Sequence, residues 1–329
     1  MSTTVRKLGA VVIGLSIVIP LVLLMFIGPA SRGAPHDVPI GVVGPPAAVG
    51  QMSSSLEQHQ PGAFDVRSFE TSDDLRDAAR NREVYGGFVL GAQPETIVAT
   101  GGSPAVATTL TQIGAGLAAQ SGAPAAPVVD VAPAADDDSR GAGFGSMVMP
   151  VFMAGVALGA TAALVGRRRR VILWALPVGA AAVAAASIGV AMAVGVLGGG
   201  FGLQWLALAA GILAIAAPVA GLVRAVGTPG IGGAALVFML VGMPLAGISA
   251  PPEFLPSIWG TVGQLLPLGA TGTALRSAAF FDGAGSPAAF AVLVAWIVIG
   301  YLLLSVPMRT PDGEVASTGV DEIGEPVAV

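Results

Sequence analysis

The order of its apolar segments constrains this chain most strongly. One apolar run stands alone at residues 8–30, the mostly polar stretch 31–143 follows, and several further apolar runs fill residues 145–307. A helix needs ~20 apolar residues to cross a hydrocarbon core of ~30 Å. The layout therefore predicts an α-helical polytopic membrane protein with six transmembrane helices and one sizeable domain outside the bilayer.

Composition favours the same class. Hydrophobic residues make up 54% of the chain and charged residues only 11%, whereas soluble domains carry ~25% charged residues. The 47 glycines are typical of membrane helices that pack closely. Cysteine is absent, which excludes disulfides, thiolate metal sites and a cysteine nucleophile. Because no basic domain exists, we expect no nucleic-acid partner.

Basic residues predict the orientation, since short cytoplasmic loops are enriched in Lys and Arg. Arg6 and Lys7 place the N-terminus in the cytoplasm of a plasma-membrane protein. The predicted later spans are 145–166, 171–196, 205–223, 228–249 and 288–307. Three basic markers fall on the cytoplasmic side of this count: Arg167, Arg168, Arg169 and Arg170 together, then Arg224, then Arg309. Both termini are therefore expected inside, with residues 31–143 extracytoplasmic.

The first run allows an alternative. A signal peptide cleaved near residues 28–34 is conceivable, but its apolar core usually spans only 7–15 residues. The longer run 8–30 favours a retained anchor. No predicted span carries a charge near its middle, which argues against a carrier driven by protons or sodium ions.

The region 31–121 predicts a small external α/β domain. Strands are expected at 38–44, 64–69, 84–91 and 95–100, and helices at 47–60, 73–83 and 104–120. Ser72 is the predicted N-cap of the second helix, with two aspartates in its first turn. Ser103 caps the third helix and is followed by proline at the first helical position.

The remaining extramembrane segments look unstructured. Residues 122–143 are rich in Pro, Ala and Asp and are predicted to be a linker, and the acidic segment 309–329 is predicted to be a disordered cytoplasmic tail. His36 and His59 have no metal-ligand spacing, and Asp136–Asp138 lack the turn glycine of a calcium loop. We therefore expect no metal site.

The sequence favours a protein without catalytic activity. It contains no nucleophile, zinc or paired-carboxylate motif with supporting context. A phosphate-binding loop needs a lysine after its second glycine, and the only lysine is Lys7. The chain is thus expected to hold no cofactor, and any ATP that drives it must bind a partner subunit.

Residues 242–283 carry the most specific pattern: GMPLAGISAPPEFLPSIWGTVGQLLPLGATGTALRSAAFFDG. The sequence of proline-rich turn, Trp, Leu-Pro and Ala-Leu-Arg resembles the last external segment of type 2 ABC exporter permeases. The single span before a large external domain is similar to one subset of that family, and to phage-infection-protein-like membrane proteins. The resemblance covers most of the chain in architecture, but its motif covers only residues 242–283.

The resemblance implies a re-entrant helical hairpin at 250–283 within a five-helix transmembrane domain, 144–308. Its key residues would be Pro251, Pro252, Trp259, Pro267 and Arg276. The alternative is a plain external loop anchored by the tryptophan at the interface. Arg167, Arg168, Arg169, Arg170 and Arg224 would contact an ATPase or lipid headgroups, although positive-inside anchoring alone also explains them. The family's cytoplasmic docking helix has no counterpart here.

The predicted function is a permease subunit of an ABC-type exporter. It would work as a homodimer or heterodimer with a separate ATP-binding subunit, among membrane lipids, and move a hydrophobic or amphipathic substrate outward. The alternative is a membrane-anchored binding or scaffold protein of the cell envelope, such as a secretion accessory or a phage receptor.

Overall fold

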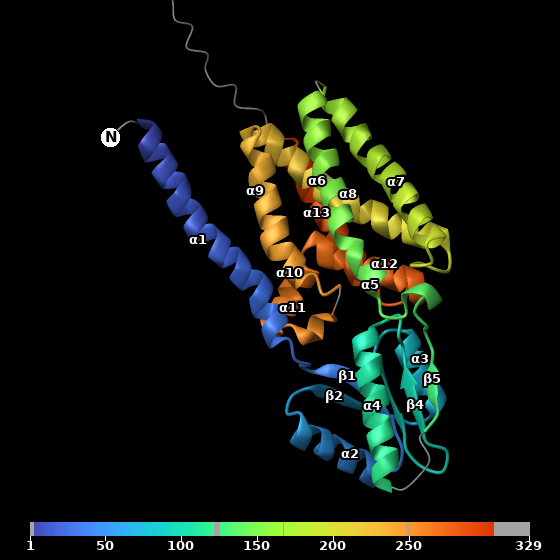
Figure 1. Ribbon diagram of the computed structural model, residues 1–329. Coiled ribbons are helices and arrows are strands. Elements are labelled where there is room, and N and C mark those ends of the chain that lie inside the picture. The colour runs from blue at the N-terminus through green and yellow to red at the C-terminus, as the bar shows by residue number, and fades with distance from the viewer. Residues whose placement is uncertain (1–2, 122–125, 167, 249, 306–329) are drawn as a thin grey trace, which may run out of the picture.

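A computed structural model describes residues 3–121, 126–166, 168–248 and 250–305. The chain forms a helical bundle and an α/β domain that lie end to end, and α1 runs along one side of the bundle (Figure 1). The α/β domain is inserted between α1 and the rest of the bundle. This is the order that the sequence predicts.

Helix α8 (Phe201–Val226) lies at the centre of the bundle, and most of its residues are buried. Its most extensive contacts are with α6 (Val148–Val165), α7 (Arg169–Ala193), α12 (Pro267–Phe280) and α13 (Pro287–Leu303). Small residues bring these helices close: a Cβ built at Gly155 of α6 would lie 2.7 Å from the Cβ of Ile215 in α8. The 3.5–4 Å that carbon atoms need for contact leaves room only for glycine there.

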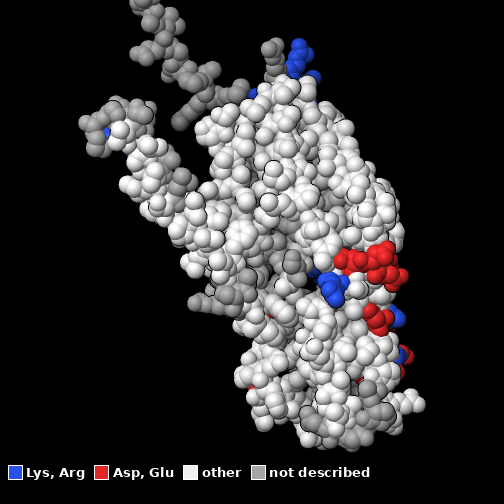
Figure 2. Space-filling view, in the orientation of Figure 1, with Lys and Arg blue, Asp and Glu red and all other residues white. Residues whose placement is uncertain are grey.

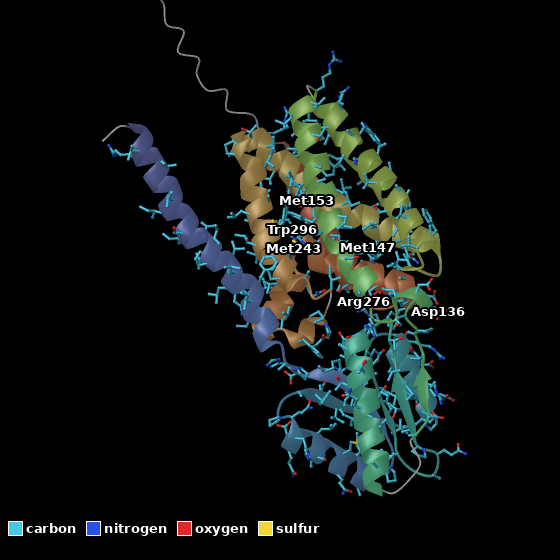
Figure 3. All side chains as sticks on the ribbon, in the orientation of Figure 1. Asp136, Met147, Met153, Met243, Arg276 and Trp296 are labelled. Atoms are coloured by element: carbon cyan, nitrogen blue, oxygen red, sulfur yellow. The ribbon has the colours of Figure 1, made fainter. Side chains whose placement is uncertain are left out.

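The other bundle elements are shorter or peripheral. They are α1 (Thr3–Arg32), α5 (Ala142–Ser146), α9 (Pro229–Val237), the π-helical turn η2 (Phe238–Gly242), α10 (Met243–Leu245), the 3₁₀ turn η3 (Pro252–Phe254) and α11 (Ser257–Gln264). Figure 3 shows Met243 and Trp296 among the bundle helices, with Arg276 where the bundle meets the α/β domain.

Three of the described helical segments are long and apolar enough to span a membrane: 142–165, 169–193 and 201–226. The apolar segments 12–24, 229–245 and 287–303 are shorter than 18 residues. The fold is thus mostly helical and compatible with a membrane protein. The count of six spans remains a prediction, because length and composition support only three of the six helices.

The sheet of the α/β domain has the order β2-β1-β3-β4-β5. Its strands are β1 (Val38–Val43), β2 (Phe64–Phe69), β3 (Gly86–Val89), β4 (Glu95–Val98) and β5 (Val128–Asp130). β1 pairs in parallel with β2 and β3, β3 pairs antiparallel with β4, and β4 pairs in parallel with β5. The register places Gly41 opposite Gly87, where a Cβ on Gly87 would meet the backbone of Gly41.

Helices cover both faces of this sheet. On one face, α2 (Pro46–His59) and α4 (Pro104–Ser121) pack over the side chains of Ile40, Val42 and Phe88. α3 (Ser72–Arg80) covers the other face. The result is a three-layer α/β/α domain, which buries its central strands on both sides.

The predicted α/β elements are confirmed, with shifted ends and two differences. The N-cap of α3 is Thr71 instead of Ser72: its hydroxyl accepts from the amide of Asp74 at 3.1 Å, and the Asp74 carboxylate accepts from the amide of Thr71. This reciprocal capping box requires an acceptor side chain three residues after the N-cap, and Asp74 meets that requirement for Thr71. The stretch predicted as a linker contributes the edge strand β5 and the short helices at 136–138 and 142–146.

Charged residues lie mainly at the two ends of the helical part. Arginines gather at the α6–α7 connection, at the end far from the α/β domain, and acidic residues with a basic patch beside them lie near the junction with that domain (Figure 2). The face of the bundle between them is almost free of charge. The N-terminal end of α1 lies toward the arginine end (Figure 1).

Candidate functional site at the domain junction

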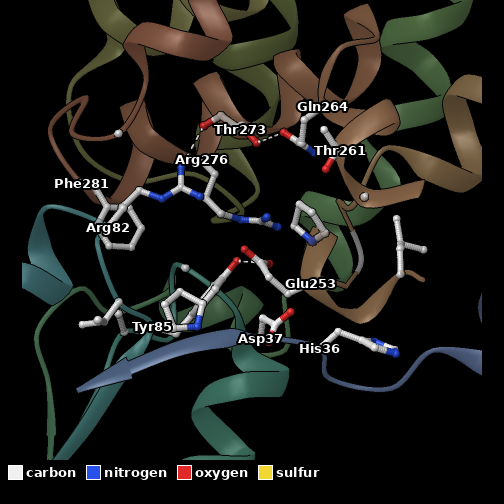
Figure 4. A pocket seen from close by; sticks show the side chains of 18 residues that line it. His36, Asp37, Arg82, Tyr85, Glu253, Thr261, Gln264, Thr273, Arg276 and Phe281 are labelled. Carbon is white, nitrogen blue, oxygen red and sulfur yellow. Dashed lines mark hydrogen bonds between the residues drawn. The ribbon is translucent and has the colours of Figure 1, made fainter. Parts of the chain in front are cut away.

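A cavity of about 540 Å³ lies between the α/β domain and the segment that contains η3, α11 and α12 (Figure 4). The α/β domain contributes His36, Asp37, Arg82 and Tyr85, and the bundle contributes Glu253, Thr261, Gln264, Thr273, Arg276 and Phe281. Residues far apart in the sequence thus form one polar site at the mouth of the helical bundle.

Arg82 reaches from the α/β domain to helix α12. Its Nη1 donates to the carbonyl oxygen of Thr273 at 3.2 Å and to the hydroxyl of Ser277 at 2.6 Å. Its guanidinium lies 5.3 Å from the ring centroid of Phe281. Burial lowers the pKa of Arg82, and the nearby Tyr85 and Glu253 oppose that shift. The backbone of Arg82 has φ +62°, a left-handed conformation that is costly for an arginine.

Tyr85 and Glu253 form a second link across the junction. The hydroxyl of Tyr85 donates to Oε2 of Glu253 at 2.8 Å, and the amide of His36 donates to the carbonyl oxygen of Glu253 at 2.9 Å. Burial raises the pKa of Tyr85 far above its usual range, and the neighbouring carboxylate adds to the shift. Tyr85 is therefore a neutral donor to an acidic side chain.

Arg276 enters the cavity from α12. The side chain is 8% exposed, its Nη2 donates to the carbonyl oxygen of Ile248 at 2.7 Å, and its guanidinium lies 4.7 Å from the centroid of Phe144. Within the described ranges, no carboxylate lies within 4 Å of the guanidinium nitrogens of Arg276 or Arg82. Two partly or fully buried cations therefore line one cavity without an ion pair.

An unpaired buried cation is costly unless a counter-charge or hydrogen-bond acceptors compensate it. Here aromatic rings, backbone carbonyls and one hydroxyl supply part of that compensation. Guanidinium groups also present donors in a planar fork that suits carboxylate and phosphate oxygens. The arrangement can therefore bind an anion.

Two of the five residues predicted in the 250–283 segment belong to this cavity. Pro252 and Arg276 line it. Pro251 is buried just before η3, Pro267 is the buried first residue of α12, and Trp259 is 42% exposed on α11. The segment forms two short helices as expected. Whether it re-enters a membrane remains a prediction.

The predicted basic residues lie at the opposite end of the bundle. Arg167 is outside the described residues, whereas Arg168, Arg169 and Arg170 are exposed at the start of α7. Arg169 donates to the hydroxyl of Ser305, and Arg224 donates to the carbonyl oxygen of Gly166 at 3.4 Å. The structure thus brings Arg224 beside the α6–α7 connection, far from the cavity.

Sequence reasoning missed Arg82, Tyr85 and Glu253 as site residues. Arg82 and Tyr85 lie more than 160 positions before Glu253, so no local motif connects them. One signal was available: Glu253 is the sole acidic residue between Asp138 and Asp282. A single carboxylate in such an apolar half of the chain indicates a specific partner.

Comparison with protein-family models, with curated proteins and with solved structures finds no match. The resemblance to exporter permeases therefore still depends on the sequence pattern alone.

Proposed function

We propose that the chain is the permease subunit of an exporter in the plasma membrane, powered by a separate ATPase and moving an amphipathic substrate outward. The observation that carries the proposal is the cavity between the α/β domain and the α11–α12 pair. Arg82 and Tyr85 fasten the α/β domain to α12 and η3, so the polar cavity lies where the apolar helices end. A molecule that leaves the bundle would enter this cavity first.

The distribution of charge supports the proposed orientation. The arginine end of the bundle carries Arg168–Arg170 and Arg224, which favours the cytoplasmic side. The α/β domain at the other end would then lie outside the cell. In this orientation an ATPase would meet the arginine end, and the cavity would open toward the exterior.

The test is affinity purification of the tagged full-length protein from its own host in a mild detergent. Mass spectrometry would identify the proteins that copurify, and ATP hydrolysis would be measured on the purified complex. A stoichiometric ATP-binding subunit whose activity rises with added lipid-like substrate supports the proposal. Recovery of the chain without any ATP-binding protein, together with normal export in a deletion strain, would contradict it.

One observation favours the alternative of a binding or scaffold protein. The connection between α6 and α7 at the arginine end consists only of residues 166–168. It therefore offers little surface for docking an ATPase. In that case the bundle anchors the α/β domain, and the cavity captures an envelope component. Crosslinking from the α6–α7 connection distinguishes the two, since only the permease requires an ATPase there.

A further inference from the structure

A second cavity of about 480 Å³ adjoins the first one. Apolar side chains from α1, α6, α10, η3 and the connections on either side of η3 dominate its wall, namely Phe26, Met149, Met243, Ile248, Phe254 and Leu255. Leu255 lines both cavities, and the carbonyl oxygen of Ile248 accepts the hydrogen bond from Arg276. A charged compartment and an apolar compartment thus lie side by side at the domain junction.

We propose that the two cavities together bind one anionic amphiphile, with its phosphate or carboxylate head between Arg82 and Arg276 and its acyl chain in the apolar cavity. Such a ligand fits a permease and a scaffold alike. It depends on the proposed function only for the further step in which the bound molecule is exported.

The charges in the first cavity favour an anionic head. The cavity also holds one half-buried carboxylate, Glu253, which accepts a hydrogen bond from the hydroxyl of Tyr85. Asp37 lies at the exposed rim, where solvent screens its charge. An excess of positive charge therefore remains on the side of Arg82 and Arg276. A phosphate or carboxylate there would accept charge-assisted hydrogen bonds from both fork-shaped groups.

The position of the second cavity favours a chain-bearing ligand over a soluble anion. Its lining residues belong to the helical part of the chain, including Phe26 of α1, whereas the charged cavity is lined in addition by residues of the α/β domain. A lipid in a bilayer has the same order, with its tail at the level of apolar helices and its head at their ends. Burial of apolar surface is favourable in proportion to its area, so an acyl chain would add affinity that a free phosphate lacks.

The experiment measures binding to the purified full chain in detergent by native mass spectrometry. The probes are phosphatidylglycerol, diacylglycerol with the same chains, and inorganic phosphate. We expect phosphatidylglycerol to bind and each of the other two to bind at least about tenfold more weakly. Because a hydrogen bond to a charged group is worth ~1.5–3 kcal/mol, Arg82→Gln and Arg276→Gln should each weaken phosphatidylglycerol at least about tenfold.

Matched variants separate the two compartments. Arg80→Gln removes the same charge from an exposed ion pair with Asp77 elsewhere in the α/β domain and should leave binding unchanged. Met149→Gln should weaken the binding of phosphatidylglycerol but leave the binding of inorganic phosphate unchanged. Met153→Gln, one turn along α6 and outside the cavity, should leave the binding of both probes unchanged. Arg276→Lys retains the positive charge, so it should bind phosphatidylglycerol more tightly than Arg276→Gln does.

The outcomes are distinct. Equal binding of diacylglycerol and phosphatidylglycerol, or binding that survives both Arg→Gln changes, would overturn the assignment of the head. Inorganic phosphate that binds as tightly as phosphatidylglycerol would assign the site to a soluble anion and overturn the amphiphile. Arginine-dependent lipid binding without any ATPase partner would uphold this site and overturn the permease.

Discussion

Arg82 donates side-chain hydrogen bonds that link the α/β domain to α12, and its removal should weaken that contact. Arg82→Gln deletes two hydrogen bonds from a charged donor, to Thr273 and Ser277. At the lower end of ~1.5 kcal/mol each, the loss is about 3 kcal/mol. Since ~1.4 kcal/mol corresponds to a factor of ten, the population of the undocked state should rise about a hundredfold. Glutamine keeps the costly left-handed backbone, so no strain is relieved.

The amide of His36 provides the readout, because its hydrogen bond to the carbonyl of Glu253 crosses the junction. Amide exchange reports local opening, so hydrogen–deuterium exchange at His36 should accelerate about a hundredfold in the variant. The amide of Val131 bonds to the carbonyl of Val98 inside the sheet and should keep its protection. Arg80→Gln is the charge-matched control. Unchanged exchange at His36, or equal acceleration at Val131, would refute the proposed role of Arg82.

Three other predictions test orientation, packing and pH dependence. Because the chain has no native cysteine, an impermeant maleimide should label Ser55→Cys in intact cells but not Thr228→Cys. The reverse labelling pattern would contradict the predicted orientation in the membrane. Gly263→Ala forces a Cβ into the backbone of α10 and should lower the free energy of unfolding by ~1–3 kcal/mol, seen as a lower melting temperature in detergent. Gly202→Ala, with open space around it, should lower the melting temperature far less. Equal melting temperatures of the two variants would contradict the tight contact. The pKa of Tyr85 is higher in the folded state than the value of ~10 expected in the unfolded state. Neutral Tyr85 therefore stabilises the fold fully below pH ~10, and this stabilisation is lost as the pH rises above that value. Tyr85→Phe should therefore flatten the alkaline fall in melting temperature, and an unchanged slope would exclude this coupling.

Local patterns made the elements of the α/β domain predictable. The run VPIGVVG and the alternating FDVRSF become β1 and β2, because β-branched and alternating apolar residues suit a sheet that is covered by helices. Ser103 caps α4 as expected, since its hydroxyl accepts from the amide of Val106 at 3.3 Å. Strand β5 was missed because it is only three residues long and its pairing partner, β4, lies outside its local sequence.

The helical half shows where sequence patterns lose information. Apolar runs indicate where helices lie, but the chain between Thr228 and Ser249 becomes two α-helical pieces around a π turn. Pro244 is a local signal for an interruption, because proline removes a backbone donor and disturbs the preceding turn, but it does not specify a π turn. The candidate site was predictable only on its bundle side, at Pro252 and Arg276. The other half of the site includes Arg82 and Tyr85, which follow α3. These residues reach the cavity only because the α/β domain docks on the bundle.

Backbone strain and unpaired charge coincide at the same junction. Among the described residues, the three non-glycine positions with positive φ are Asp37, Arg82 and Asp282. Two of them line the cavity, and the third follows Phe281, which also lines it. Such conformations cost of order 1–3 kcal/mol each and persist only where surrounding contacts impose them. Docking alone requires neither strained backbone nor buried cations, because an apolar contact such as Phe281 against Ala99 and Ala132 would suffice. The combination is better explained by a cavity that holds charge in a fixed geometry for a ligand.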